Sequence, residues 1–292
     1  MHAAFCMHGR SHINMANSWL GLLPVLSHLC HTSCRYFHSR HRNTMASKDF
    51  RHRFGRRLDI NECQFETAGS LKRVYTHPDM PDVVLKIVDP ERTHGEGRLK
   101  GESFIKRKNP LGVYRGFRRE LTQYLILSRR WNEDVCGAPP LAVPCGLQPT
   151  TAGLALVTEK IINADGELAP TLEKLFQTGA VELKHLEALE RFFEACIAMH
   201  VVLSDMHMRQ FLYSEVRSGR PEFVVIDGIG EKNMIPLRSL SVRLNGRRLS
   251  KARDQIFQEI FDHYPALQRQ WTARRADASR SELVRGPSAE GR

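Results

Sequence analysis

Acidic residues are scarce at both ends of this 292-residue chain, and the scarcity accounts for most of its positive charge. Residues 1–57 hold nine Lys and Arg but one acid, a net of +8, and residues 272–292 hold five Arg and three acids, a net of +2. Because the whole chain is +11, residues 58–271 carry only +1. A nucleic-acid-binding fold needs a basic face on the fold itself. We therefore do not expect the folded core to bind nucleic acid.

Long hydrophobic runs are also missing. A transmembrane helix needs roughly 20 consecutive apolar residues, and the longest apolar patch, WLGLLPVL at 19–26, is short and interrupted by Pro24. We therefore expect no transmembrane segment. The Arg-rich, acid-poor leader 1–57 fits a targeting peptide, but we favour a leader that is either disordered or, over residues 1–44, not native, with Met45 as the true start.

Cysteines are few and lack the spacing of a disulfide framework. The chain has seven, an odd number, and those of its central part are scattered at Cys63, Cys136, Cys145 and Cys196. Disulfides persist in oxidising compartments, whereas cytoplasmic thiols stay reduced. The sequence therefore predicts a cytoplasmic protein without structural disulfides.

The first part of the folded core is rich in β-prone residues. Two turn signals, at 68–70 and 77–81, separate three runs that predict an antiparallel meander; these runs cover residues 61–67, 71–76 and 82–88. A polar loop with four glycines is expected over 90–112. The apolar periodicity that follows predicts an amphipathic helix over 113–132.

Two further strands and then mainly helices are expected. The strands fall at 141–147 and 153–162, and the helices at 170–178, 181–201 and 249–263. Between the last two helices, LSDMHMRQFLYSEVRSGRPEFVVIDGIG at 203–230 predicts a hairpin. After Trp271 we expect a disordered tail, 272–292.

This order of elements predicts an α+β fold with segregated halves. We expect a small β-rich lobe over about 58–162 and a reduced helical lobe over about 163–271. The cleft between two such lobes is the usual place for a ligand.

Charged residues stand at unusual places in this pattern. Lys86 interrupts the apolar strand VVLKIV, and a buried ammonium needs an anionic partner; Glu120 on the following helix is the candidate. Asp205 precedes the hairpin and Asp227 follows it. Each residue alone has an ordinary explanation, such as an edge-strand lysine or an Asp-Gly turn, and only their order favours a site.

The ordered set resembles the protein-kinase-like arrangement. The resemblance implies that Lys86, held by Glu120, contacts the phosphates of ATP, that Asp205 is the catalytic base, and that Gln210 and Asp227 bind Mg²⁺. Further nucleotide-binding candidates by the same resemblance are Gly69 and Ser70, in a reduced glycine-rich loop, and Glu159 and Ile161 in TEKII.

More closely, the chain resembles the YrbL-type proteins of the PhoP regulatory network, a bacterial family. The resemblance is carried by GSLKRVYTHPDMPDVVLKIV, RRELTQYLIL, TTAGLALVTEKIINADGELAPTLEKL and VVIDGIGEKNMIPL, and it covers roughly residues 60–262. It implies a kinase-like core and a regulatory context more than a particular reaction.

The sequence departs from the kinase pattern at several positions. Leu203 and Ser204 replace the usual His and Arg, Gln210 replaces Asn, Gly69 is the one glycine of its loop, and no Ala-Pro-Glu follows Asp227. Two functions therefore stay open. One is a small atypical kinase that transfers phosphate from ATP to an unknown acceptor. The other is an inactive kinase-like regulatory module that binds a nucleotide or a protein partner.

Overall fold

The structure is a computed structural model that describes residues 57–94, 98–100, 110–130, 138–232 and 236–285. All of them belong to one structural unit, Arg51–Arg292. The leader expected at 1–57 lies outside the described residues, except for its last residue, Arg57. The described part is α+β, as the sequence predicts.

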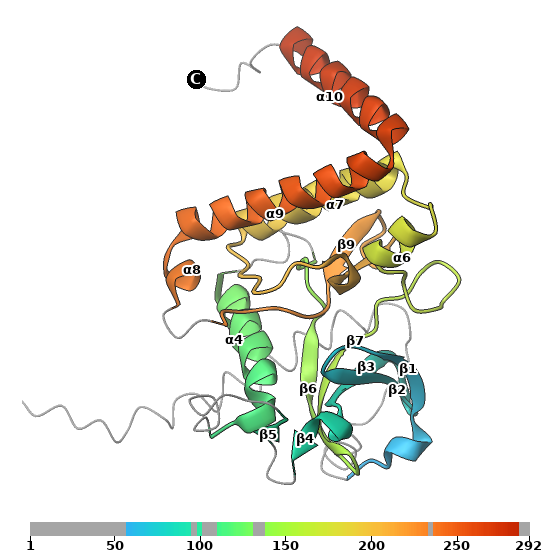
Figure 1. Ribbon diagram of the computed structural model, residues 1–292, viewed down its shortest axis with the longest axis vertical. Coiled ribbons are helices and arrows are strands. Elements are labelled where there is room, and N and C mark those ends of the chain that lie inside the picture. Colours follow the sequence, from blue (N-terminus) through green and yellow to red (C-terminus); the bar gives the residue numbers. More distant parts are fainter. Residues whose placement is uncertain (1–56, 95–97, 101–109, 131–137, 233–235, 286–292) are drawn as a thin grey trace, which may run out of the picture. The chain divides into compact units, whose positions relative to one another are not determined.

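A five-stranded antiparallel sheet is formed by the first half of the described chain (Figure 1). Its strands, in spatial order, are β1 (Gln64–Ala68), β2 (Lys72–His77), β3 (Met80–Val88), β7 (Gly153–Glu159) and β6 (Pro144–Thr150). The predicted meander and the two later strands are thus confirmed. β1 begins later than expected because the Asp59 side chain caps a 3₁₀ turn, Ile60–Glu62.

Alternation along β3 sends its residues to two different faces of the sheet. Val83, Leu85 and Ile87 pack with Ala155 and Val157 of β7 in one buried cluster. Lys86 belongs to the alternate set of β3 and is buried there, with 4% of its surface exposed. Lys86 therefore lies on the face of the sheet opposite this cluster.

Helix α4 (Arg115–Arg130) covers that second face of the sheet. Its Phe117 packs with Val88 and Leu156 of the sheet. Glu120 lies three residues after Phe117, so helical geometry places both on the same side of α4. The sequence predicted this helix over 113–132, and its packing turns Glu120 toward the strands.

The polar segment before α4 was expected to be a loop, and this expectation was incomplete. It contains a small antiparallel hairpin, β4 (Thr93–His94) with β5 (Arg98–Leu99). Strands of two residues are too short to produce a hydrophobic period. The sequence therefore could not predict β4 and β5.

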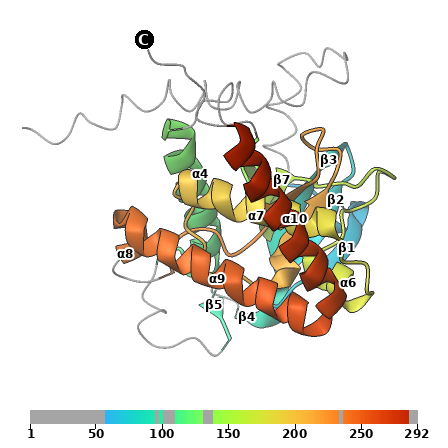
Figure 2. The same cartoon turned by 90° about the horizontal axis from the view of Figure 1, so that it is seen from above.

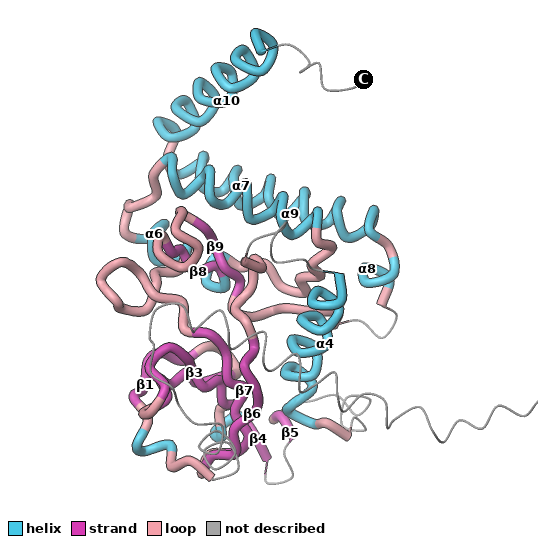
Figure 3. The backbone as a smooth tube through the Cα atoms, turned by 180° about the vertical axis from the view of Figure 1, so that it is seen from behind, coloured by secondary structure: helices cyan, strands magenta, loops and turns pink. Residues whose placement is uncertain are grey.

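Helices dominate the second half of the chain. α6 (Leu172–Gln177) and α7 (Leu183–Ala198) contact the hairpin of β8 (Phe211–Ser214) and β9 (Glu222–Val225). α9 (Val242–His263) packs on α7, and the short α8 (Leu237–Leu240) packs on α9. Figures 1 and 3 show α7 and α9 side by side, with the hairpin next to them. Phe193, Phe211 and Phe223 lie in their shared core. Within the described ranges, none of the helices is both apolar and long enough to cross a bilayer.

The chain after Trp271, expected to be disordered, continues as helix α10 (Pro265–Arg285). Figure 2 shows α10 running from the end of α9 across α7. Leu267 and Trp271 are buried against this core, and Arg274 and Arg275 pair with acids of α7. The tail prediction was wrong for 272–285 because tertiary contacts, rather than local composition, order the helix.

Candidate functional site

The two ends of the β8–β9 hairpin lie beside one another. Leu203 bridges to Ile229 in antiparallel fashion. The backbone amide and hydroxyl of Ser204 both donate to the Gly228 carbonyl, at 2.7 and 2.8 Å. The structure therefore brings Asp205 next to the residue that follows Asp227.

Gly228 is the meeting point of these residues. Its φ is +73°, and a Cβ there would lie 3.0 Å from the Asp205 Cβ, from the Asp205 carbonyl and from the Gln210 Oε1. Only glycine combines this backbone conformation with so little space. The close approach is what places Asp205 and Gln210 around the Asp227 turn.

Lys86 and Glu120 face each other, as the sequence predicts. The Lys86 Nζ lies 3.5 Å from the Glu120 Oε2, and both side chains are 6% exposed. Lys86 also donates to the carbonyl of Ile226, the residue before Asp227. Burial lowers the pKa of Lys86 below its ordinary value, and the Glu120 charge offsets this only in part.

A second lysine, Lys72, completes the cluster, and sequence reasoning missed it. Its Nζ lies 2.5 Å from the Glu120 Oε1 and 2.9 Å from the Asp227 Oδ1. Burial alone would lower the pKa of Lys72, but the two carboxylates raise it above its ordinary value. Burial would likewise raise the pKa of Asp227, yet Lys72 and Lys86 hold it well below its usual range. We call Lys72, Lys86, Glu120 and Asp227 the lysine–carboxylate cluster.

Asp205 has partners of its own, outside this cluster. Its carboxylate lies 2.9 Å from the His207 Nε2 and 3.5 Å from the Lys232 Nζ. Gln210 is buried, and its Oε1 has no hydrogen-bond partner among the described residues. A buried acceptor without a donor is costly, so this amide oxygen is an available ligand beside Asp227.

The remaining predicted residues are not drawn into the cluster by any described side-chain contact. Gly69 and Ser70 are exposed in the β1–β2 turn, where the Gly69 amide donates to the Lys72 carbonyl at 2.8 Å. Glu159 pairs with Arg217 at 2.8 Å. Ile161 is buried in a separate apolar cluster. The turn thus adjoins the site through Lys72, while the side chains of Glu159 and Ile161 have structural contacts.

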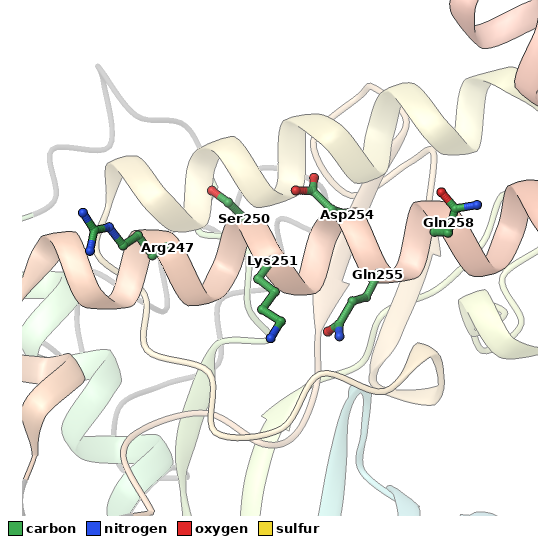
Figure 4. A pocket seen from close by; sticks show the side chains of 6 residues that line it. All are labelled: Arg247, Ser250, Lys251, Asp254, Gln255 and Gln258. Atoms are coloured by element: carbon green, nitrogen blue, oxygen red, sulfur yellow. The ribbon is translucent and has the colours of Figure 1, made fainter.

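A cavity of about 560 Å³ lies elsewhere, along α9 (Figure 4). Its lining side chains all come from that helix: Arg247, Ser250, Lys251, Asp254, Gln255 and Gln258. None of the predicted site residues lines it. This pocket is therefore separate from the lysine–carboxylate cluster.

The fold and the cluster together define an α+β protein in which a sheet, a helix and a hairpin meet at ion-paired lysines and carboxylates. Residues 58–260 match the family described as PhoP regulatory network protein YrbL, and the chain belongs to this family. No curated protein sequence gives a match to the chain.

Proposed function

We propose that this chain is an atypical kinase-like protein that binds ATP with Mg²⁺ at the lysine–carboxylate cluster and transfers its terminal phosphoryl group. One observation carries the proposal: ion pairs connect Lys72, Lys86, Glu120 and Asp227 in one cluster. Lys72 pairs with both acids, and Lys86 pairs with Glu120. A strand lysine held by a helix glutamate beside an aspartate is the arrangement with which protein kinases bind nucleotide phosphates. The five-stranded sheet, α4 and the hairpin would then form a reduced kinase-like fold.

The residues present suit Mg²⁺ better than a metal that needs an all-protein cage. Among the described residues, no three His, Cys, Asp or Glu side chains converge as ligands. Mg²⁺ usually takes only one or two carboxylates and keeps phosphate oxygens and water as its other ligands. Asp227, whose side chain is 45% exposed, and the unpaired Gln210 Oε1 would hold it. A bound Mg²⁺ supplies charge neutralisation at the phosphates.

Asp205 is the residue we assign to the transfer step. The hydroxyl oxygen of an acceptor bonds to the γ-phosphorus of ATP, the bond from that phosphorus to the β–γ bridging oxygen breaks, and ADP leaves. The hydroxyl proton passes to the Asp205 carboxylate, which is 33% exposed and therefore accessible. The acceptor belongs to the regulatory context that the family's name describes.

One observation favours a second candidate, a regulatory module that binds nucleotide without transfer. The Asp205 carboxylate lies between two basic groups, His207 and Lys232. His207 contacts one carboxylate oxygen of Asp205 and Lys232 contacts the other, so neither oxygen is left free for an acceptor hydroxyl. Binding would then serve to change contacts with a protein partner.

Substitution of the two aspartates separates these candidates. We expect Asp227→Asn to weaken Mg²⁺-dependent ATP binding by roughly tenfold or more, about 1.4 kcal/mol or more, because it removes the charge that holds the cation. Asp205→Asn should leave binding nearly intact, since a base contributes to proton transfer rather than to ground-state affinity. Isothermal titration with ATP, with and without Mg²⁺, measures both effects.

Turnover completes this test. If wild type hydrolyses ATP slowly or phosphorylates itself and Asp205→Asn does not, the kinase function stands. If wild type and Asp205→Asn both bind ATP but show equally negligible turnover, the regulatory module is the function that remains. A wild-type protein that binds no ATP under either condition would contradict both.

A further inference from the structure

Two ammonium groups share the carboxylate of Glu120, but they sit at different depths. The Lys72 Nζ contacts one oxygen at 2.5 Å and the Lys86 Nζ contacts the other at 3.5 Å. The side chain of Lys72 is 15% exposed and that of Lys86 is 6% exposed. Of the two lysines, Lys72 is the one that pairs directly with Asp227, whose side chain is 45% exposed. The open end of the cluster is therefore at Lys72 and Asp227.

Lys86 is held at the closed end. Besides Glu120, it donates to the Ile226 carbonyl, and the Ile226 amide in turn donates to the Gln210 carbonyl at 3.0 Å. An ammonium group has three protons to donate, and these two contacts direct Lys86 toward backbone and Glu120. Its position fixes the strand end that presents Asp227.

Lys72 has the opposite setting. It is the first residue of β2 and lies one residue beyond the exposed Gly69–Ser70 turn, whose Gly69 amide donates to its carbonyl. Its Nζ lies 5.7 Å from the centre of the Phe117 ring, which supports it from the side of α4. Lys72 is thus the more exposed of the two lysines.

We propose that Lys72, rather than Lys86, is the lysine that binds the phosphate groups of the nucleotide, and that Lys86 is a positioning residue for Glu120 and Asp227. This inference rests on the proposed nucleotide binding. The phosphate groups of a nucleoside triphosphate would then contact a lysine of β2, whereas the sequence predicted a lysine of the adjacent strand β3.

The charges of the cluster agree with this division. Two lysines and two carboxylates balance one another, so the cluster has no spare positive charge for phosphate. Lys72 contacts both acids. With Asp227 holding a bound cation, Lys72 would keep Glu120 as its partner and could pair with a phosphate oxygen. Lys86 needs no rearrangement, because its contacts lie away from the open end.

The test compares matched lysine variants of the full chain by titration calorimetry with ATP and with adenosine, both in Mg²⁺. We expect Lys72→Met to weaken ATP binding at least tenfold and to leave adenosine binding unchanged, and Lys72→Arg to restore part of the ATP affinity. Lys184→Met, at an exposed lysine on α7, is the control and should bind ATP as wild type does. Circular dichroism checks that each variant is folded.

Lys86→Met should act differently. We expect a lower midpoint of thermal unfolding, because Glu120 loses a buried partner, with ATP affinity reduced less than in Lys72→Met. Inorganic triphosphate is a second probe: it should raise the unfolding midpoint of wild type and Lys86→Met but not that of Lys72→Met. If Lys72→Met binds ATP as wild type does, or a folded Lys86→Met loses ATP more than Lys72→Met, the assignment to Lys72 is overturned. If wild type itself binds no ATP, the proposed function fails as well.

Discussion

Gly228 shows at the scale of single residues how closely the site is built. Its φ of +73° costs an alanine about 1–2 kcal/mol, and the added Cβ would also press against Asp205 and Gln210 at 3.0 Å. Overpacking of this kind typically costs about 1–3 kcal/mol. We therefore expect Gly228→Ala to lower the free energy of unfolding by roughly 2–5 kcal/mol, measured by urea denaturation.

Gly219 provides the matched control. Its φ is +77°, but a Cβ there would meet no described atom within 4 Å. Gly219→Ala should therefore show the conformational cost alone. Equal losses of stability in the two variants would mean that the contacts around Gly228 are not tight.

The residues of the site differ in how readable they are from sequence. Lys86 and Glu120 could be paired because a lysine inside an apolar strand requires a buried acid. Lys72 could not, because KRVYTH mixes charged and apolar residues on both faces. Its nearness to Lys86 follows from the register of β2 with β3, where Val74 lies opposite Lys86 and Lys72 is the diagonal neighbour. The pairing of β2 with β3 also shifts register between Thr76 and His77. The sequence pattern does not predict this irregularity.

At the scale of elements, the start of α7 contains a pH-sensitive cap. The Nδ1 of the buried His185 accepts a hydrogen bond from the Glu182 amide at 2.8 Å. Burial lowers the pKa of His185, Lys184 lowers it further, and Glu182 and Glu215 oppose this. The Tyr213 ring packs against the imidazole at 4.3 Å between ring centres. Protonation would remove the acceptor and place a charge in this packed position.

The sign of the pH effect follows from the lowered pKa. The unfolded chain, with a histidine pKa of about 6.5, binds the proton more readily than the folded one. His185 thus contributes stability above about pH 6.5 that is lost as the pH falls below it. We expect the unfolding midpoint of wild type to decline between pH 8 and 5 more steeply than that of His185→Gln, since glutamine can accept the same bond without titrating.

Thermal unfolding across this pH series, monitored by circular dichroism, measures the difference between the two proteins. The comparison cancels the contributions of the other histidines. Parallel curves for wild type and His185→Gln would show that this cap does not titrate in that range.

Elements with a sustained period were predictable, and the others were not. α4, α7, α9 and the five sheet strands each repeat a helical or alternating pattern over several residues. The β4–β5 hairpin is too short to do so, and α10 has an apolar contact only in its first turns. α9 begins at Val242 rather than at 249 because the Ser241 side chain accepts from the Leu244 amide and caps it there.

At the scale of the whole folded unit, α10 closes the core of the helices. Trp271 is 6% exposed and lies 5.5 Å from Phe257, measured between ring centres. Removing a buried tryptophan typically costs about 3–5 kcal/mol. We expect Trp271→Ala to lose about 3 kcal/mol of unfolding free energy in urea denaturation, and Thr272→Ala, at an exposed neighbour, to lose little.

This prediction also tests the correction of the tail. If Trp271→Ala were as stable as Thr272→Ala, the helix would not be packed on α7 and α9. The family match ends at residue 260, before α10 begins. A large loss would therefore show that the chain depends on a helix beyond the matched region.

The order of elements, and hence the α+β class, could be predicted because most segments show the hydrophobic period of a helix or of a strand. The candidate site could be predicted only in part, since it is assembled from β2, β3, α4 and the hairpin. Local sequence indicates that charges need partners. It does not indicate which of two lysines lies at the open end, because that depends on how four elements pack.

Gly230, three residues after Asp227, lies in close contact with Arg119 of α4. A Cβ on Gly230 would lie 2.9 Å from the Arg119 carbonyl oxygen, and its amide donates to the Val202 carbonyl at 2.7 Å. Arg119 directly precedes Glu120, so α4 cannot shift toward this segment without moving it. If the cluster binds a ligand as proposed, its occupancy and the position of α4 would be thermodynamically linked. Any partner that grips the exposed Leu125 and Ile126 of α4, and prefers one position of the helix, would alter ligand affinity, and the ligand would alter the partner's affinity by the same factor.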